Sequence, residues 1–157
     1  GRSKMKITEF LSPDAVIGSL SAKEKSAVLE ELCRPLASRL PNVSVEQLRE
    51  VLEDREKLGS TGIGEGVAIP HGKLPGLPSL MATFGRSIEG VDFDAIDGKP
   101  THLFFALFAP ENSAGIHLKA LARISRLFKN ANLRKAILAA QDEREIFRLI
   151  TEEDAKY

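Results

Sequence analysis

The sequence predicts a single α/β domain in which a mixed sheet lies between helical layers. Three observations support this fold class. The chain has 157 residues, which suits one domain better than two. Strand-like and helix-like segments alternate along it. The longest uninterrupted apolar run, Leu103 to Ala109, is typical of a central strand that is buried on both faces.

The first half of the chain contains two predicted helices. Ser21 to Glu24 resembles a capping box, and apolar residues at helical spacing follow it up to Leu40. Pro35 lies inside this pattern and is expected to kink or split the helix. A second capping box, Ser44 to Gln47, opens a helix that is expected to end near Gly59.

The middle of the chain contains the predicted strands. A β-like run at residues 67–69 follows a glycine-rich stretch and is expected to end at the Pro70-His71-Gly72-Lys73 turn. Strands are predicted at residues 80–88 and 103–109, with a further short one near residues 91–93.

Three helices are predicted in the last third of the chain, at residues 116–128, at residues 133–140 and from Asp142 onward. Residues 1–4 are interpreted as a tag remnant or a disordered N-terminus, because Met5 is a plausible natural start. Residues 5–157 form the single predicted domain.

Composition excludes several classes of function. Lys+Arg and Asp+Glu both number 22, so the basic excess that is typical of nucleic-acid binders and of proteins held on anionic membranes is absent. No run is long enough to be inserted in a membrane. A single cysteine, Cys33, suits a reducing cytoplasm, which is the expected location. The histidines show no metal-ligand spacing, so neither a metal nor a cofactor is expected.

The glycine-rich stretch does not match a nucleotide-binding motif. Gly62, Gly64 and Gly66 follow a predicted helix and precede a strand, which is the wrong order and spacing for a dinucleotide fingerprint. Five residues separate Gly66 from Gly72-Lys73, and Leu74 follows, so a P-loop is excluded as well.

A histidine next to this stretch is a candidate nucleophile. His71 lies between Pro70 and Gly72, where a large partner could reach the imidazole. Imidazole suits covalent phosphoryl transfer because one ring nitrogen is unprotonated near neutral pH. On the local pattern alone, the alternative that His71 only packs a turn is equally good.

Two further residues are candidates for holding a phosphoryl group. His117 lies in the first turn of a predicted helix, where anions are favoured, although an exposed first-turn residue is the simpler interpretation. Arg55 lies at the edge of an apolar helix face and could bind phosphate oxygens through paired donors. Alternatively, Arg55 only complements the helix dipole.

The segment from Glu56 to Lys73, with the sequence EKLGSTGIGEGVAIPHGK, resembles the phosphorylation-site signature of enzyme IIA proteins of the fructose–mannitol class of the bacterial phosphoenolpyruvate-dependent phosphotransferase system. Phe93 to Pro100, the apolar run from Leu103 and the segment from His117 to Arg123 resemble the same family. The amino-acid sequence of residues 55–64 and 93–97 is most similar to the corresponding segments of the nitrogen-regulatory branch.

The resemblance implies a mannitol-type enzyme IIA fold with a five-stranded mixed sheet and helices on both faces. It implies that His71 accepts a phosphoryl group from a histidine-phosphocarrier protein, flanked by His117 and Arg55. The backbone N–H groups of a loop are expected to hold the phosphoryl oxygens, with help from the hydroxyls of its first two residues: Ser60, Thr61, Gly62, Ile63 and Gly64.

The expected activity is that of a phosphotransferase that acts as a nitrogen- and potassium-linked regulator. Its expected partners are the phosphocarrier donor and target proteins such as potassium transporters or sensor kinases. Two alternatives remain open. One is a sugar-specific enzyme IIA that passes phosphate to a fructose or mannitol permease domain, and the other is an interaction module in which His71 is never phosphorylated.

Overall fold

The computed structural model describes residues 4–157. The strands are β1 (Val16–Ile17), β2 (Gly62–Gly64), β3 (Val67–Ala68), β4 (His71–Lys73), β5 (Met81–Val91) and β6 (Thr101–Ala109). The α-helices are α1 (Lys25–Ala37), α2 (Val45–Glu56), α3 (Ala114–Leu127), α4 (Ala131–Ala139) and α5 (Glu143–Asp154). Two 3₁₀-helices precede β1: η1 (Ile7–Glu9) and η2 (Pro13–Ala15). Of the predicted tag remnant, only Lys4 lies within the described residues.

The sheet is mixed and its strands run in the order β1-β5-β6-β3-β2, with β4 also paired to β6. β5 is antiparallel to β6, whereas β3 and β4 are both parallel to it. Val67 pairs with Leu103 and His71 pairs with Leu107, so β3 and β4 keep one register along the same edge of β6. The six strands therefore occupy five positions, which agrees with the predicted five-stranded mixed sheet.

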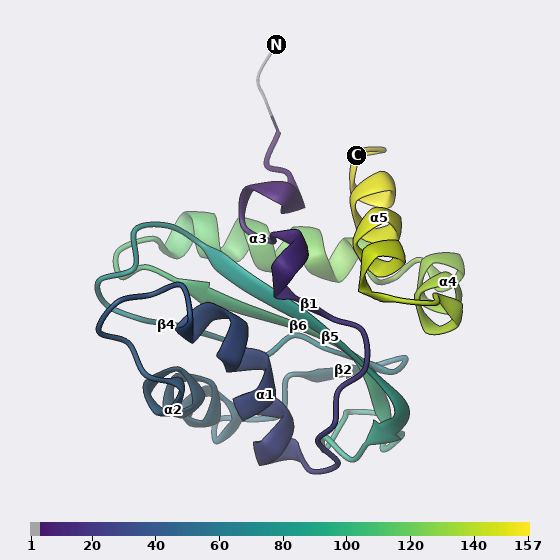
Figure 1. The fold of residues 1–157 in the computed structure, drawn as a ribbon, viewed down its shortest axis with the longest axis horizontal. Coiled ribbons are helices and arrows are strands. Elements are labelled where there is room, and N and C mark those ends of the chain that lie inside the picture. The colour runs from purple at the N-terminus through teal and green to yellow at the C-terminus, as the bar shows by residue number, and fades with distance from the viewer. Residues whose placement is uncertain (1–3) are drawn as a thin grey trace.

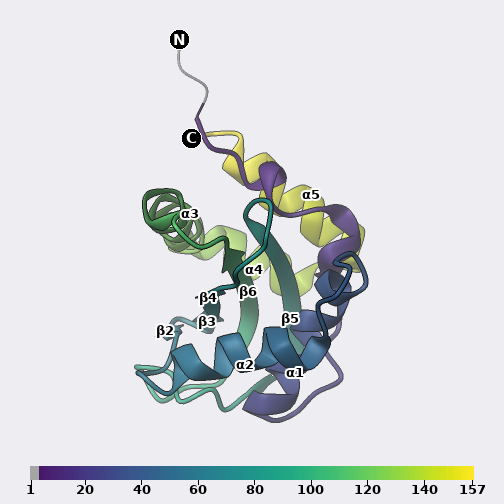
Figure 2. The same cartoon turned by 90° about the vertical axis from the view of Figure 1, so that its left-hand side faces the viewer.

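Helices cover both faces of the sheet, as predicted (Figure 1). α1 and α2 pack on one face, and α3, α4 and α5 lie on the other, which the turned view in Figure 2 shows edge-on. Alternate residues of β6 serve the two cores: Phe105 and Leu107 face the α3 side, whereas Phe104 and Phe108 face α1 and α2. All four are fully buried. Within residues 4–157, no helix has the length and apolar character that a membrane crossing requires.

The two predicted helix starts have opposite outcomes. Ser44 does cap α2: its hydroxyl accepts from the N–H of Gln47 at 3.1 Å, and the Gln47 amide oxygen accepts from the N–H of Ser44 at 2.8 Å. The capping box at Ser21 is wrong, because α1 begins at Lys25. The Glu31 carboxylate, further along α1, accepts from the Ser21 N–H instead and holds the chain before the helix. Pro35 lies in the last turn of α1 and does not split it.

The strand predictions need three corrections. Pro70 to Lys73 is not a turn, because His71 to Lys73 form β4 and pair with β6. The predicted strand near residues 91–93 is not separate, since β5 continues to Val91 through an irregular register after Arg86. Residues 5–20, for which no helix or strand is predicted, contain η1, η2 and β1, and β1 pairs in parallel with β5.

Arg86 on β5 joins the sheet to α4. It is only 3% exposed, and it donates to the carbonyl oxygens of Gly18 at 2.8 Å, Ile137 at 2.8 Å and Ala140 at 2.6 Å. These carbonyls include two from the C-terminal end of α4, where helix carbonyls lack partners in the helix and a cation is favourable.

The Arg86→Leu variant is therefore expected to be less stable by about 3 kcal/mol, because buried carbonyls left without a donor each cost roughly 1–3 kcal/mol. Urea unfolding measures this. Arg148→Leu is the matched control, since Arg148 is exposed and, within residues 4–157, forms an ion pair only with Glu152 on the surface of α5. The control should change stability by no more than about 0.5 kcal/mol. Equal effects in both variants would contradict the role assigned to Arg86.

Candidate functional site

His71 is held in β4 by a hydrogen bond to its own chain. Its Nδ1 lies 2.8 Å from the carbonyl oxygen of Ile69, and the side chain is half-buried. A carbonyl can only accept, so Nδ1 carries the proton of the neutral ring. Nε2 is then the nitrogen with a free lone pair, and the backbone fixes the tautomer that nucleophilic attack requires.

His117 reaches the same place from the first turns of α3. The two imidazole rings are 5.6 Å apart, centroid to centroid, and lie edge to face at 78°. His117 is 8% exposed, and within the described part of the chain its buried Nε2 has no hydrogen-bond partner. An unpaired buried nitrogen costs roughly 1–3 kcal/mol. An acceptor placed between the two rings would remove that cost.

Both imidazoles are held in the neutral form. Burial lowers the pKa of His71, and the nearby charge of Arg55 lowers it further, while the bond to the Ile69 carbonyl acts in the opposite direction. Burial also lowers the pKa of His117, with additional contributions from His71 and Lys73. A neutral His71 is the nucleophilic form, and a dianion placed here would meet the positive charges of Arg55 and Lys73.

Both histidines are therefore expected to titrate below the ordinary histidine pKa of about 6.5. Below pH 6.5 the unfolded chain binds protons that the folded protein does not yet bind, so the free energy of unfolding falls as the pH drops from about 6.5 through the lowered pKa values. ¹⁵N NMR titration of the imidazole nitrogens measures the midpoints. Midpoints at or above 6.5 would contradict this picture of the site.

Arg55 is brought to the site by the close contact between α2 and β4. A Cβ on Gly72 would overlap the side chain of Val51 and lie 3.2 Å from the Val51 carbonyl oxygen. The position that a Gly72 side chain would occupy therefore faces Val51 of α2, one turn before Arg55. The glycine lets α2 pack closely on β4, and it does not serve to make room for the imidazole. The Arg55 guanidinium donates from Nη1 to the Gly59 carbonyl at 2.9 Å, which anchors it at the start of the glycine-rich loop.

Gly72→Ala is expected to push α2 away from β4, with a loss of about 1–3 kcal/mol in stability, typical of an over-packed contact. The Val51→Ala/Gly72→Ala double variant should recover part of this loss, because it removes the overlapping methyl groups. Gly115→Ala is the control, since nothing lies within 4 Å of a Cβ there. Chemical denaturation compares the four proteins. A double variant as unstable as Gly72→Ala would show that Val51 is not the obstacle.

The predicted loop begins with two hydroxyl residues that are both engaged within the protein. The Ser60 hydroxyl donates to the Phe93 carbonyl at 2.7 Å and accepts from the Gly62 N–H at 3.0 Å. The Thr61 N–H donates to the Glu56 carboxylate at 3.1 Å, and the Thr61 hydroxyl donates to the same group. Ser60 and Thr61 therefore shape the loop.

Glu56 is a residue that the sequence reasoning missed. Its side chain is 6% exposed, it pairs with Lys25 at 3.0 Å, and it holds Thr61 at the same time. It follows Arg55 directly in α2, so one helix end positions both the guanidinium and the loop. The signature segment begins at Glu56, but nothing in that pattern assigns its carboxylate a role.

The remaining loop residues lie in β2. Gly62 pairs with Ala68 and Gly64 pairs with Val67, so the glycine-rich stretch is a β-hairpin rather than an open loop. Ile63 and Gly64 line a cavity beside α3, and within the described residues neither His71, His117 nor Arg55 lines it. The structure thus brings His71, His117 and Arg55 together. The phosphate-holding role of Ser60–Gly64 stays a prediction.

Comparison with known proteins identifies the class to which this fold and site belong. Residues 9–153 match the family described as "Phosphoenolpyruvate-dependent sugar phosphotransferase system, EIIA 2". The chain is 41% identical to a nitrogen regulatory protein of Bradyrhizobium diazoefficiens, over 93% of this chain and 95% of that protein. The chain therefore belongs to the enzyme IIA 2 family of the phosphotransferase system, as its resemblance indicated.

Two further relatives show both branches of that family. The crystal structure of the nitrogen regulatory protein IIA-Ntr from Neisseria meningitidis superposes with a TM-score of 0.86 at 36% identity, covering 92% of this chain and 99% of that one. The fructose-specific EIIABC component of Bacillus subtilis is 38% identical over 96% of this chain, which corresponds to 24% of its own length. These likenesses support a phosphocarrier role within the phosphotransferase system.

Proposed function

We propose that the protein is a phosphohistidine carrier in which His71 accepts a phosphoryl group from a histidine-phosphocarrier protein. The observation that carries this proposal is the convergence of a tautomer-fixed His71, the unpartnered Nε2 of His117 and the Arg55 guanidinium. A phosphoryl group bonded to His71 would lie beside the His117 ring and in the field of the Arg55 charge.

The transfer step follows from this geometry. The Nε2 lone pair of His71 attacks phosphorus while the bond from phosphorus to the donor nitrogen breaks, and the leaving nitrogen keeps that electron pair. The Ile69 carbonyl stabilises the positive charge that develops on the His71 ring through the Nδ1 proton. Arg55 and His117 hold the equatorial oxygens, where charge is spread during phosphoryl transfer. The N–H groups of Thr61 and Gly62 already donate within the protein, so assistance from residues 60–64 is proposed to come from the other N–H groups of this segment.

A protein donor fits the surface around His117. The side chain of His117 points inward, whereas its neighbours Ile116 and Leu118 are 52% and 70% exposed. Leu58, just beyond Arg55, is 84% exposed. Exposed apolar side chains of this kind can form the buried apolar centre of a protein interface.

We propose that the role is regulatory: the phosphorylation state of His71 would decide which protein binds, among targets such as potassium transporters or sensor kinases in the cytoplasm. The likeness to nitrogen regulatory proteins over nearly their full length supports this. A dianion on His71 would change docking at the same surface through repulsion and desolvation. The 38% identity to a fructose-specific component favours the second candidate, a sugar-specific enzyme IIA.

One experiment separates the two roles. The protein is phosphorylated with phosphoenolpyruvate, enzyme I and the phosphocarrier, purified, and mixed with a fructose or mannitol permease domain or with candidate regulatory targets. The regulatory role predicts slow transfer to the permease domain and target binding that differs between the two phosphorylation states. Rapid transfer of phosphate to the permease domain, with no partner that distinguishes the states, would favour the sugar-specific role.

A further inference from the structure

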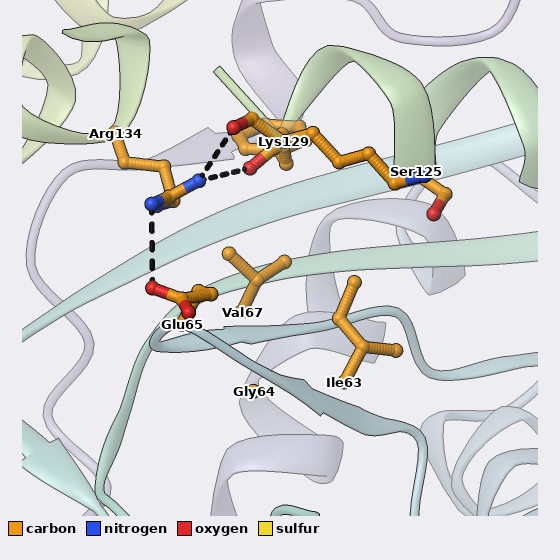
Figure 3. Close-up of a pocket in the computed structure, with 8 residues that line it drawn as sticks. Ile63, Gly64, Glu65, Val67, Ser125, Lys129 and Arg134 are labelled. Carbon is orange, nitrogen blue, oxygen red and sulfur yellow. Dashed lines mark hydrogen bonds and ion pairs between the residues drawn. The ribbon is translucent and has the colours of Figure 1, made fainter. Parts of the chain in front are cut away.

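A cavity lies at the far end of α3 from His117. Its volume is about 430 Å³, and it is enclosed between the β2–β3 hairpin and the junction of α3 and α4 (Figure 3). The hairpin contributes Ile63, Glu65 and Val67, and the helices contribute Phe128, Lys129 and Arg134. Val67 and His71 pair with β6 residues four positions apart, or roughly 13 Å along the strand. The cavity is thus separate from the phosphoryl site.

The cavity has an apolar floor and one oriented cation. Val67 and Phe128 are each 2% exposed, and in Figure 3 the side chains of Val67 and Ile63 rise from the hairpin toward the end of α3. The Arg134 side chain is 15% exposed. Its Nη1 donates to the carbonyl oxygens of Phe128 at 2.8 Å and Lys129 at 3.0 Å, which fixes the guanidinium plane.

The positive charge of this cavity is only weakly compensated. The Nη2 of Arg134 reaches Glu65 at 3.4 Å, a long contact to a side chain that is 77% exposed. Exposed pairs of this kind contribute little free energy. Lys129 is exposed at the rim and has no ion pair within residues 4–157. The cavity lining therefore carries two cations and one carboxylate, and the largely buried guanidinium can accept a better partner.

Glu65 lies at a position that is unusual for its side chain. Glu65 and Gly66 form the hairpin tip with φ of 57° and 76°, the arrangement of a two-residue turn that favours Asn, Asp or Gly. Its carboxylate nevertheless lies beside Arg134, in the place that the carboxylate of a bound ligand would take. Since the side chain is exposed, the carboxylate can leave without a change in the backbone of the tip.

We propose that this cavity binds a small organic carboxylate. The carboxylate head pairs with the Nη2 edge of Arg134 and with Lys129 and displaces Glu65, because a guanidinium fork matches a planar carboxylate. A short branched hydrocarbon body lies against Ile63, the exposed apolar side chain of the cavity lining, above Val67 and Phe128. The volume falls within the range of small-ligand sites. The inference concerns the unphosphorylated protein and does not depend on the function proposed for His71.

The test compares isovalerate with its neutral counterpart isovaleramide by amide NMR titration at constant ionic strength. Isovalerate is expected to give saturable shifts in residues 62–68 and 125–134, and isovaleramide is expected to give none. Absence of saturable shifts with isovalerate, or equal shifts with the amide, would overturn the proposal.

Two charge variants test the assigned roles without disturbing the helix-capping contacts of Arg134. Glu65→Gln removes the competing carboxylate and should tighten isovalerate binding roughly fivefold, whereas Lys129→Gln should weaken it by a similar factor, the size of one exposed ion pair. Lys135→Gln and Glu50→Gln make the same charge changes at exposed positions that do not line the cavity. If each variant matched its control, the proposed site would be wrong.

Discussion

The His71→Gln variant is expected to take up no phosphate when the wild-type protein takes up one. The substitution removes the nucleophilic Nε2. The guanidinium of Arg55 is not a nucleophile, and the Nε2 of His117 is buried away from an incoming donor. Intact mass after incubation with phosphoenolpyruvate, enzyme I and the phosphocarrier measures the uptake. The wild-type adduct should be labile in acid and stable in base, as expected for a phosphoramidate.

His102→Gln is a matched control for this experiment. His102 also lies in a strand and also has Nδ1 within hydrogen-bond distance of a backbone carbonyl, that of Ser87 at 2.9 Å. A general effect of losing a histidine from the sheet would therefore appear in both variants. The account predicts a full phosphate on the control protein. Undiminished labelling of His71→Gln would remove His71 as the acceptor.

His117→Ala is expected to accept phosphate slowly, at a rate lower than wild type by on the order of 100-fold or more, because loss of one donor to a transferring group typically has that effect. Arg55→Lys should also be slow, since an ammonium group cannot reproduce a two-donor fork. Rapid-quench measurement of phosphoryl transfer from the phosphocarrier gives both rates. Leu118→Ala, which alters only an exposed neighbour, separates loss of chemistry from loss of donor docking.

Folding must be intact for these rates to be informative. Removal of His117 also removes an unpartnered buried nitrogen, so the variant is expected to fold with little loss of stability. Wild-type rates in both His117→Ala and Arg55→Lys would show that neither residue assists phosphoryl transfer. His117 would then only pack in the protein, and Arg55 would only complement the end of its helix.

The sequence predicts the layers of the fold well because their signals are local. The apolar run from Leu103 lies on both cores, and the Ser44 capping box begins α2 as expected. The strand that carries His71 could not be predicted in this way. Pro70 and Gly72 are turn-forming residues, yet pairing with Leu107 and its neighbours holds the segment in the sheet, and Gly72 is needed because α2 packs against it.

The candidate site likewise contains residues that the sequence reveals and residues whose role depends on contacts in the folded chain. His71, His117 and Arg55 are all candidates from the sequence, and the resemblance assigns them to one site. The structure brings the two imidazole rings together and places the charge of Arg55 near them. Glu56 could not be found, because its role depends on contacts with Lys25 and Thr61 that only the folded chain creates. For the same reason, the sequence does not indicate that the Thr61 hydroxyl donates a hydrogen bond to Glu56.

The measurement that tests the central claim most directly is long-range ¹H–¹⁵N NMR of the phosphorylated protein, which distinguishes the two ring nitrogens of each histidine. The account predicts phosphorus on Nε2 of His71, with Nδ1 still protonated and bound to the Ile69 carbonyl. Phosphorus on Nδ1 of His71, or on His117, would contradict it.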